Sequence, residues 1–352
     1  MFSKLFNLFS RNIGIDLGTA FTLVYVEKNG IVINEPSVVA INQKTGQIVA
    51  VGNDARQMIG RTPAHITAVR PLIEGVISDF EVTEEMLAYF IKKAKVNKNR
   101  FFSRPRIVIG IPSGITEVER RAVREAALNA GANEVYLIEE PMAAAIGINL
   151  PIQEAVGSMI VDIGGGTTDI AVISLGGIVN SINLRVAGDK LNQDIINYLR
   201  EEFKLLIGER TAEEIKINIG NVWEESGDRE ESVIRGRDLI TGLPKEMTIT
   251  SLNVKEALSK SIKILVDSIK EVIEETPPEL ISDIMAKGIF LVGGGALLKG
   301  IDKLISQEIK IPVFADSDPL TAVARGTGKI LENFEELRKI LMEAKDEELA
   351  PR

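Results

Sequence analysis

The 352-residue chain carries a net charge of −9, 45% hydrophobic residues, no cysteine and one histidine. Its length and apolar content predict a globular protein of two or more packed units. The lack of cysteine excludes disulfides and thiolate chemistry, and a single histidine excludes a histidine-based metal cluster. The acidic balance opposes general binding to nucleic acid or anionic lipid, so we expect no nucleic-acid partner and only local basic patches for lipid.

No run of about 18 apolar residues occurs, because Asp162 and Asp169 interrupt the most apolar stretch. The first residues also lack a secretory apolar region and a cleavage site. We therefore expect a cytoplasmic protein.

The first ten residues, MFSKLFNLFS, place four apolar side chains on one helical face: Phe2, Leu5, Phe6 and Phe9. A helix of this length has little stability in water. The segment therefore either docks on the protein's own core or becomes ordered on a lipid surface. Lys4 and Arg11 favour the lipid surface because they suit anionic headgroups.

Residues 12–41 alternate apolar and polar positions around Asn29-Gly30, which predicts a hairpin, and continue into a third strand toward Ile41. Residues 35–74 form a candidate insertion. Further along, RIVIGI at 106–111 predicts a strand. A helix ending at Gly131, the strand VYLIEE and a helix opened by Pro141 follow it. This alternation is typical of an α/β protein.

The pattern then restarts. MIVDIGGGTTDIAVI at 159–173 repeats the order of IGIDLGTAFTLVYV at 13–26: an apolar strand, Asp, a small-residue turn, Thr and a second strand. IFLVGGGALLKG at 289–300 predicts a strand that enters a helix through glycines. The repeat predicts two related halves that face one another across a cleft. Residues 186–247 are more polar and predict a helical insertion, with a capping box at Thr211 and Glu214.

Both glycine turns follow an acid, Asp16 or Asp162. Backbone N–H groups that converge in such a turn can bind an anion, and small residues let phosphate oxygens approach the main chain. The acid would repel phosphate unless a divalent cation lay between them, so the pattern predicts Mg²⁺ and phosphate together. The alternative is that the glycines merely shape tight hairpins. The sequence contains no P-loop. The segment most like one, GTGKI at 326–330, lacks the first glycine and the hydroxyl residue of that motif.

Four segments together resemble the nucleotide cradle of the actin, hexokinase and DnaK-type chaperone superfamily, and most closely the MreB/Mbl family of bacterial actins. They are IGIDLGTAFTLVYV, IEEPMAAAIG, IVDIGGGTTDIAV and IFLVGGGALLKG. The resemblance runs from the N-terminal segment to about residue 335. It implies an actin-like ATPase fold, with two related α/β lobes that each carry a smaller inserted subdomain around a nucleotide cleft.

The resemblance also implies site residues for ATP and Mg²⁺. The first phosphate loop would comprise Gly14, Asp16, Gly18, Thr19 and Ala20, and the second Gly164, Gly165, Gly166, Thr167 and Thr168. Asp16 and Asp162 would hold the metal, largely through water. Glu140 would orient or activate the attacking water, with Thr167 fixing that water from the opposite wall, and Glu139 would be mostly structural. Adenosine would lie against Glu213 and Lys216 on one side and Gly294, Gly295 and Ala296 on the other, although an acid and lysine three apart are often only a solvated salt bridge.

Family subdomains follow from the same resemblance. Subdomain IA would comprise 1–34, 75–149 and 313–352, and IB would comprise 35–74. Subdomain IIA would comprise 150–185 and 248–312, and IIB 186–247.

A second membrane candidate is Phe101-Phe102, which lies among basic residues. This patch alone could also suit nucleic acid, but the acidic total and the resemblance favour lipid. Single chains would bind lipid weakly, and a filament would bind through many aligned anchors.

The resemblance implies a slow ATPase that polymerises with itself on the inner face of the cytoplasmic membrane and organises lateral cell-wall synthesis in rod-shaped cells. RodZ, MreC and MreD are the partners that it implies. A cradle of this kind also serves other functions. The alternatives are a sugar or small-molecule kinase and a chaperone-like ATPase, although the chain has no room for a substrate-binding β-domain or lid.

Overall fold

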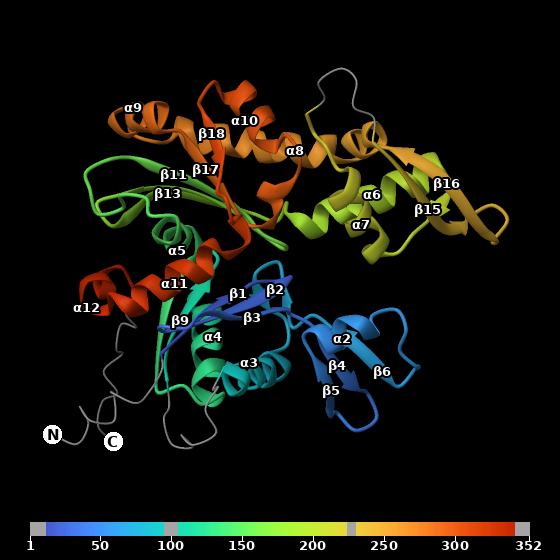
Figure 1. The fold of residues 1–352 in the computed structure, drawn as a ribbon, viewed down its shortest axis with the longest axis horizontal. Coiled ribbons are helices and arrows are strands. Elements are labelled where there is room, and N and C mark those ends of the chain that lie inside the picture. The colour runs from blue at the N-terminus through green and yellow to red at the C-terminus, as the bar shows by residue number, and fades with distance from the viewer. Residues whose placement is uncertain (1–11, 95–104, 224–229, 342–352) are drawn as a thin grey trace. The chain divides into compact units, whose positions relative to one another are not determined.

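The computed structural model describes residues 12–94, 105–223 and 230–341. The chain divides into two compact units, the first formed by Met1–Leu150 with Val323–Arg352 and the second by Pro151–Ala322 (Figure 1). The chain therefore crosses between the units at 150/151 and again at 322/323. Within the described ranges, no helix is long and apolar enough to cross a membrane.

The first unit is built on a five-stranded sheet in the order β10-β9-β1-β2-β3. Its strands are β1 (Ile13–Leu17), β2 (Phe21–Val26), β3 (Gly30–Pro36), β9 (Arg106–Ile111) and β10 (Glu134–Glu139). The first three strands form an antiparallel meander, whereas β9 pairs parallel to β1 and β10 pairs parallel to β9. The predicted hairpin at Asn29-Gly30 is confirmed, but Ile41 lies in a different, smaller sheet.

The second unit repeats this topology with the order β18-β17-β11-β12-β13. Its strands are β11 (Ser158–Ile163), β12 (Thr168–Ser174), β13 (Gly177–Leu184), β17 (Ile289–Val292) and β18 (Val313–Ala315). Again three strands form an antiparallel meander, and two more add in parallel beside the first. The prediction of two related halves is confirmed at the level of strand order.

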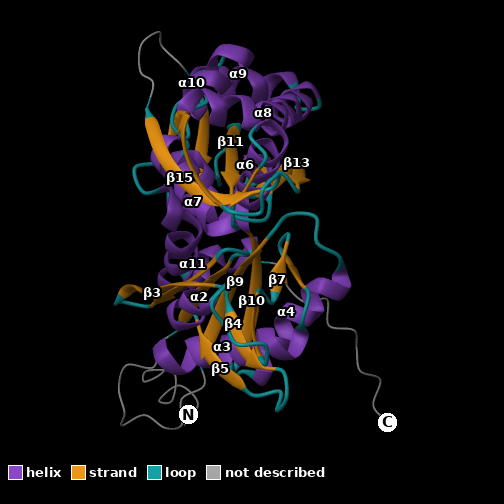
Figure 2. Cartoon of the chain, turned by 90° about the vertical axis from the view of Figure 1, so that its right-hand side faces the viewer, coloured by secondary structure: helices purple, strands orange, loops and turns teal. Residues whose placement is uncertain are grey.

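Helices flank the sheets within each unit (Figure 2). The first unit contains α2 (Asn53–Met58), α3 (Phe80–Ala94), α4 (Glu117–Asn129), α5 (Glu140–Gly147), most of α11 (Ala322–Glu332) and α12 (Phe334–Leu337). The second contains α6 (Gly188–Glu202), α7 (Glu209–Ile219), α8 (Ser251–Glu274), α9 (Pro278–Lys287) and α10 (Ile301–Ile309). Short 3₁₀ helices are η1 (Gly294–Leu297), η2 (Pro319–Thr321) and η3 (Arg338–Ile340). Each unit has its own buried apolar cluster around its sheet.

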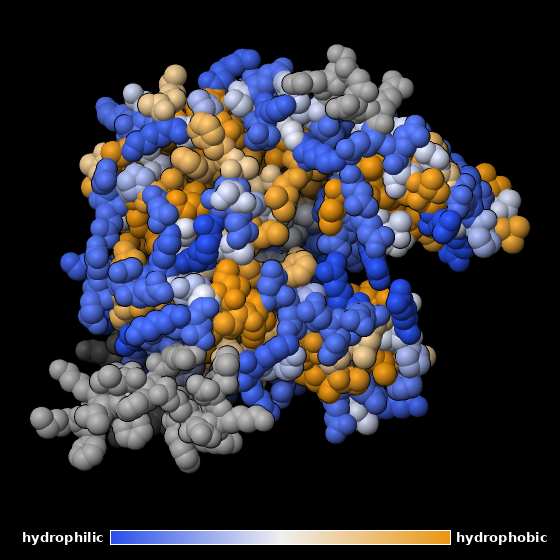
Figure 3. All heavy atoms as spheres, viewed as in Figure 1, coloured by the Kyte–Doolittle hydropathy of each residue, from blue (hydrophilic) through white to orange (hydrophobic). Residues whose placement is uncertain are grey.

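The described residues also form three small sheets. They comprise β4 (Val39–Asn42), β5 (Ile48–Val51) and β6 (Ile66–Val69); β7 (Leu72–Ile73) and β8 (Val76–Ile77); and β14 (Leu205–Leu206), β15 (Glu231–Asp238) and β16 (Pro244–Thr250). The sheet that contains β15 and β16 differs from the helical insertion predicted for 186–247. Each of its two long strands, β15 and β16, has a single fully buried side chain, Ile234 or Ile249, so the apolar alternation in the sequence is weak. Figure 3 shows apolar side chains at the end of this hairpin, where Leu239, Ile240 and Leu243 are exposed.

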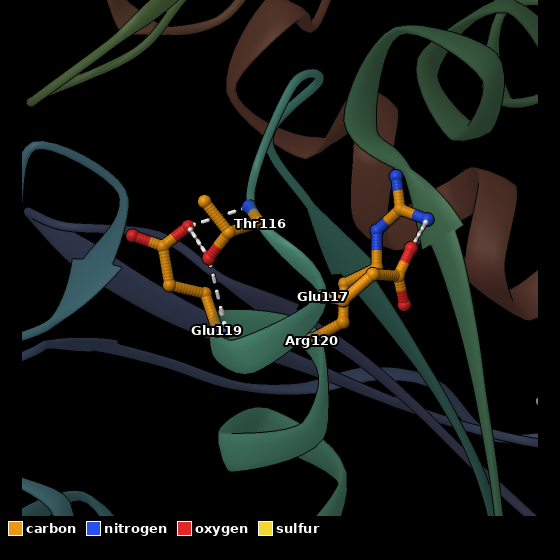
Figure 4. A network of polar contacts seen from close by, with 4 residues as sticks. All are labelled: Thr116, Glu117, Glu119 and Arg120. Atoms are coloured by element: carbon orange, nitrogen blue, oxygen red, sulfur yellow. Dashed lines mark hydrogen bonds and ion pairs between the residues drawn. The ribbon is translucent and has the colours of Figure 1, made fainter.

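Two details of the prediction are corrected. Capping boxes lie at the starts of α4 and α8. At α4, Thr116 accepts from the Glu119 amide at 3.3 Å and the Glu119 carboxylate accepts from the Thr116 amide at 2.6 Å (Figure 4). At α8, Thr250 and Asn253 make the equivalent pair of bonds, at 3.4 and 3.0 Å. Thr211 instead lies inside α7, which begins after Gly208 without a side-chain cap. The second unit also continues to Ala322, beyond the predicted boundary at 312, because β18 pairs with β17.

Candidate functional site

The first predicted phosphate turn joins β1 to β2. Asp16 lies one register position before the end of the hairpin, opposite Leu23 on β2 and Gly110 on β9. Gly18 is required there, because a Cβ would lie 2.7 Å from the Phe21 carbonyl oxygen.

Neighbouring segments hold this turn in place. The Ser37 hydroxyl donates to the Gly18 carbonyl at 2.6 Å, and the Ser37 amide donates to the Ala20 carbonyl at 3.0 Å. The Thr19 hydroxyl accepts from the Gly75 amide at 2.9 Å. Hydrogen bonds from neighbouring segments of the same unit therefore fix the conformation of this turn.

The second predicted turn joins β11 to β12, and Asp162 occupies the position equivalent to Asp16. It pairs with Asp169, one position before the hairpin ends at Ile163 and Thr168. The Gly164 amide donates to the Thr167 carbonyl at 2.9 Å, which closes the turn. Both Asp162 and Thr167 are buried. The two acids thus stand at the same place in two sheets of the same topology.

The start of α6 adjoins the second turn. The Gly188 amide donates to the Gly164 carbonyl at 3.1 Å, and the Asp189 amide donates to the Gly165 carbonyl at 2.8 Å. The Lys216 ammonium, on α7, donates to the Gly188 carbonyl at 2.8 Å. Burial lowers the pKa of Lys216, and the charge of Glu213 opposes that shift. Lys216 is therefore buried beside the second turn and within electrostatic reach of Glu213.

The three glycines after β17 have different roles. Gly293 has φ +77°, and a Cβ there would lie 2.3 Å from Asp162 Oδ1. A Cβ on Gly295 would lie 2.1 Å from Ile163 Cγ2. A Cβ on Gly294 would meet only Leu320 Cδ2, at 3.3 Å. The outer two glycines are thus needed to pack against the end of β11, whereas protein packing does not explain Gly294.

Glu140 lies near Asp16 within the first unit. It is the first residue of α5, and its Cγ lies 3.6 Å from the position that a Cβ on Gly110 would take. Gly110 is the register neighbour of Asp16, so both carboxylate side chains lie at the same end of this sheet. The predicted Pro141 in the first turn of the helix is confirmed. Burial raises the pKa of Glu139, the preceding residue.

Asp16 and Asp162 fit a Mg²⁺ site in which water and ligand phosphates supply most of the coordination. Burial raises the pKa of Asp16 to about 7, and a nearby cation would favour the charged form. Among the described residues there is no group of three or more His, Cys, Asp or Glu side chains that could hold a metal by themselves. Mg²⁺ in proteins is typically bound by one or two carboxylates with water and substrate phosphates.

One predicted residue has a different setting, and two exposed apolar residues near the candidate site were not predicted. Gly14 lies inside β1, where a Cβ would overlap Thr327 at 2.3 Å, so it serves packing and is not part of the turn. Leu297 and Leu320 were missed. They are 58% and 46% exposed on η1 and η2 and present an apolar platform beside Gly294. An exposed leucine has no sequence signal of its own.

The candidate membrane residues lie outside the described residues. They are Phe2, Leu5, Phe6, Phe9, Phe101 and Phe102.

The comparisons with known proteins agree with this geometry. A model of the MreB/Mbl protein family matches residues 10–339. The chain is 52% identical over 332 residues to cell shape-determining protein Mbl of Bacillus subtilis, covering 94% of this chain and 99% of that protein. It is 52% identical over 337 residues to cell shape-determining protein MreB of Escherichia coli, with 94% and 96% covered.

Solved structures give the same result. The crystal structure of MreB5 of Spiroplasma citri bound to ADP has 39% identity and a TM-score of 0.88, with 94% of this chain and 99% of that chain covered. The MamK double helical filament has 23% identity and a TM-score of 0.79, with 92% and 99% covered, and so shows similarity of fold alone.

Proposed function

We propose that this chain, which belongs to the MreB/Mbl family and has an actin-like fold, binds and slowly hydrolyses ATP with Mg²⁺. The ATP-bound protein polymerises into filaments that lie on the inner face of the cytoplasmic membrane. There the filaments organise lateral cell-wall synthesis and maintain the rod shape of the cell.

One observation carries the nucleotide proposal: Asp16 and Asp162 occupy equivalent register positions in two sheets of identical strand order, each just before a turn of small residues. A hairpin needs no acid at this position, and a duplicated one suits a ligand with several phosphates. The similar MreB5 of Spiroplasma citri was solved with ADP and with AMPPNP, which supports a nucleotide here.

In this proposal both turns grip one ATP. Asp16 and Asp162 would hold Mg²⁺, largely through water, and the bound ion would supply neutralisation of the phosphate charge. Glu140 orients the attacking water and accepts its proton, and Thr167 hydrogen-bonds to that water. Phosphoryl transfer requires little beyond positioning and charge neutralisation. Lys216, Glu213 and the platform of Leu297 and Leu320 would hold the adenosine.

The filament proposal is supported by the relatives at 52% identity, which are cell shape-determining proteins. Each filament would hold the membrane by avidity, through the apolar side chains of the N-terminal segment and of Phe101-Phe102. RodZ, MreC and MreD are the partners that we propose at the membrane.

Sedimentation with ATP and Mg²⁺, with and without anionic liposomes, tests this proposal. We expect the protein to pellet with ATP, and liposomes to lower the concentration required. Protein that stays monomeric at high concentration in both conditions would refute the filament proposal. Asp162→Asn is the matched variant, because it preserves the shape of the side chain and should pellet poorly.

A further inference from the structure

The segment Gly326-Thr327-Gly328-Lys329 of α11 fails as a P-loop, but the structure gives it another role. A Cβ on Gly326 would lie 1.8 Å from the Ala143 carbonyl oxygen of α5. Thr327 packs on β1 against Gly14, and Gly328 packs against the ring of Tyr25 on β2. The small residues therefore press α11 onto both α5 and the strand that carries Asp16.

Lys329 caps the C-terminal end of α5. Its ammonium donates to the carbonyls of Ile146 at 3.1 Å and Gly147 at 2.7 Å, and to Asn149 Oδ1 at 2.6 Å. These carbonyls belong to the last turn of α5, where the negative end of the helix dipole favours a cation. The Ile146 carbonyl also accepts from the Asn149 amide at 3.1 Å, so Lys329 adds to the backbone bonds that end the helix. Asn149 lies just before the point where the chain leaves the first unit.

The two helices remain in register along their contact. Val323 Cγ1 and Glu140 Cγ both flank Gly110, Gly326 meets Ala143, and Lys329 meets Ile146. The sequence separation is the same at all three levels, so α5 and α11 run in the same direction side by side. The residues of α5 from Pro141 to Gly147 are all buried, so the position of this short helix is set by its packing and by the contacts at its ends.

We propose that Lys329 is a positioning residue for Glu140. By holding the C-terminal carbonyls of α5, it fixes the axial position of the helix and hence of the carboxylate at its other end. This inference rests on the proposed role of Glu140 in ATP hydrolysis. A plain helix cap would give stability alone, whereas a positioning residue also affects the rate through Glu140.

A double-mutant cycle in phosphate release separates these two roles. Lys329→Met keeps the apolar stem and removes the charge, and Lys329→Arg restores the charge. Lys204→Met is the control, because Lys204 donates to the Glu201 carbonyl at 2.7 Å at the end of α6, in the other unit. Labelled ATP affinity and amide hydrogen exchange of 140–149 are measured for each variant.

We expect Lys329→Met to lower kcat by about tenfold or more, because small displacements of a catalytic group are costly. ATP affinity should change less than about twofold, since Lys329 would touch no nucleotide. Lys329→Arg should recover most of the rate, Lys204→Met should match the unmodified protein, and exchange in α5 should rise. In the Glu140→Ala background, Lys329→Met should lower the rate no further.

An unchanged kcat, or an equal fall in both backgrounds, would overturn the inference. Absence of hydrolysis by the unmodified protein is a separate outcome, because it would refute the proposed ATPase itself.

Discussion

The three glycines at 293–295 give a prediction within the candidate site. Alanine at Gly293 must adopt φ +77° and must displace the Asp162 carboxylate, which lies 2.3 Å from the new methyl group, and the Ile163 carbonyl, at 2.5 Å. With ψ 170° this is an extended positive-φ conformation that is nearly restricted to glycine; for alanine it costs about 1–3 kcal/mol, and overpacking against backbone costs about 1–3 kcal/mol. We therefore expect Gly293→Ala to lower the free energy of unfolding of the second unit by about 3 kcal/mol.

At about 2–4 °C per kcal/mol for a unit of this size, Tm should fall by about 6–12 °C. Gly294→Ala is the matched variant, because its methyl group meets only the flexible end of Leu320. It should leave the Tm of the nucleotide-free protein within about 2 °C but weaken the stabilisation by Mg·ATP, if Gly294 faces the nucleotide. Thermal unfolding by circular dichroism, with and without Mg·ATP, measures both effects. Equal Tm values for the two nucleotide-free variants would refute this reasoning.

Three further predictions concern the site and the membrane. Glu140→Ala should retain ATP binding while phosphate release falls by about a hundredfold or more, and unchanged release would place the catalytic role elsewhere. Because burial raises the pKa of Asp16 from 3.8 to about 7, the folded protein keeps a proton that the unfolded chain loses near pH 4. The free energy of unfolding of nucleotide-free protein should therefore fall as pH rises from about 4 to about 7, and Asp16→Asn should flatten this dependence in urea titrations at several pH values. Deletion of residues 2–10 should abolish flotation with anionic liposomes and leave the circular dichroism spectrum of the fold intact; persistent flotation would shift the proposed anchor to Phe101 and Phe102.

The repeated halves were predictable because their signals are local. An apolar strand, an acid and a small-residue turn occur within about fifteen residues, and the hydrophobic pattern fixes the pairing within each hairpin. The positions of Asp16 and Asp162 follow directly. The turn after α4 was also predictable, since Gly131 has φ +105° and few other residues adopt that conformation readily.

Other features depend on contacts between distant parts of the chain. The pairing of β18 with β17, the bond from Lys216 to Gly188 and the clamp by Lys329 join residues that no sequence spacing connects. Nothing in the sequence around Gly14 or Gly293 marks either glycine as a packing position. Only the residues that surround them in the structure show that a Cβ would overlap a neighbour at both sites. The strands β15 and β16 were missed because each buries only one side chain fully, Ile234 or Ile249, so their apolar alternation is weak.

Calorimetric titration with Mg·ATP tests most directly whether two equivalent turns grip one nucleotide. We predict saturable binding of a single ATP per chain, weakened by Asp16→Asn and also by Asp162→Asn. Two ATP molecules per chain, or no heat at millimolar nucleotide, would contradict the account.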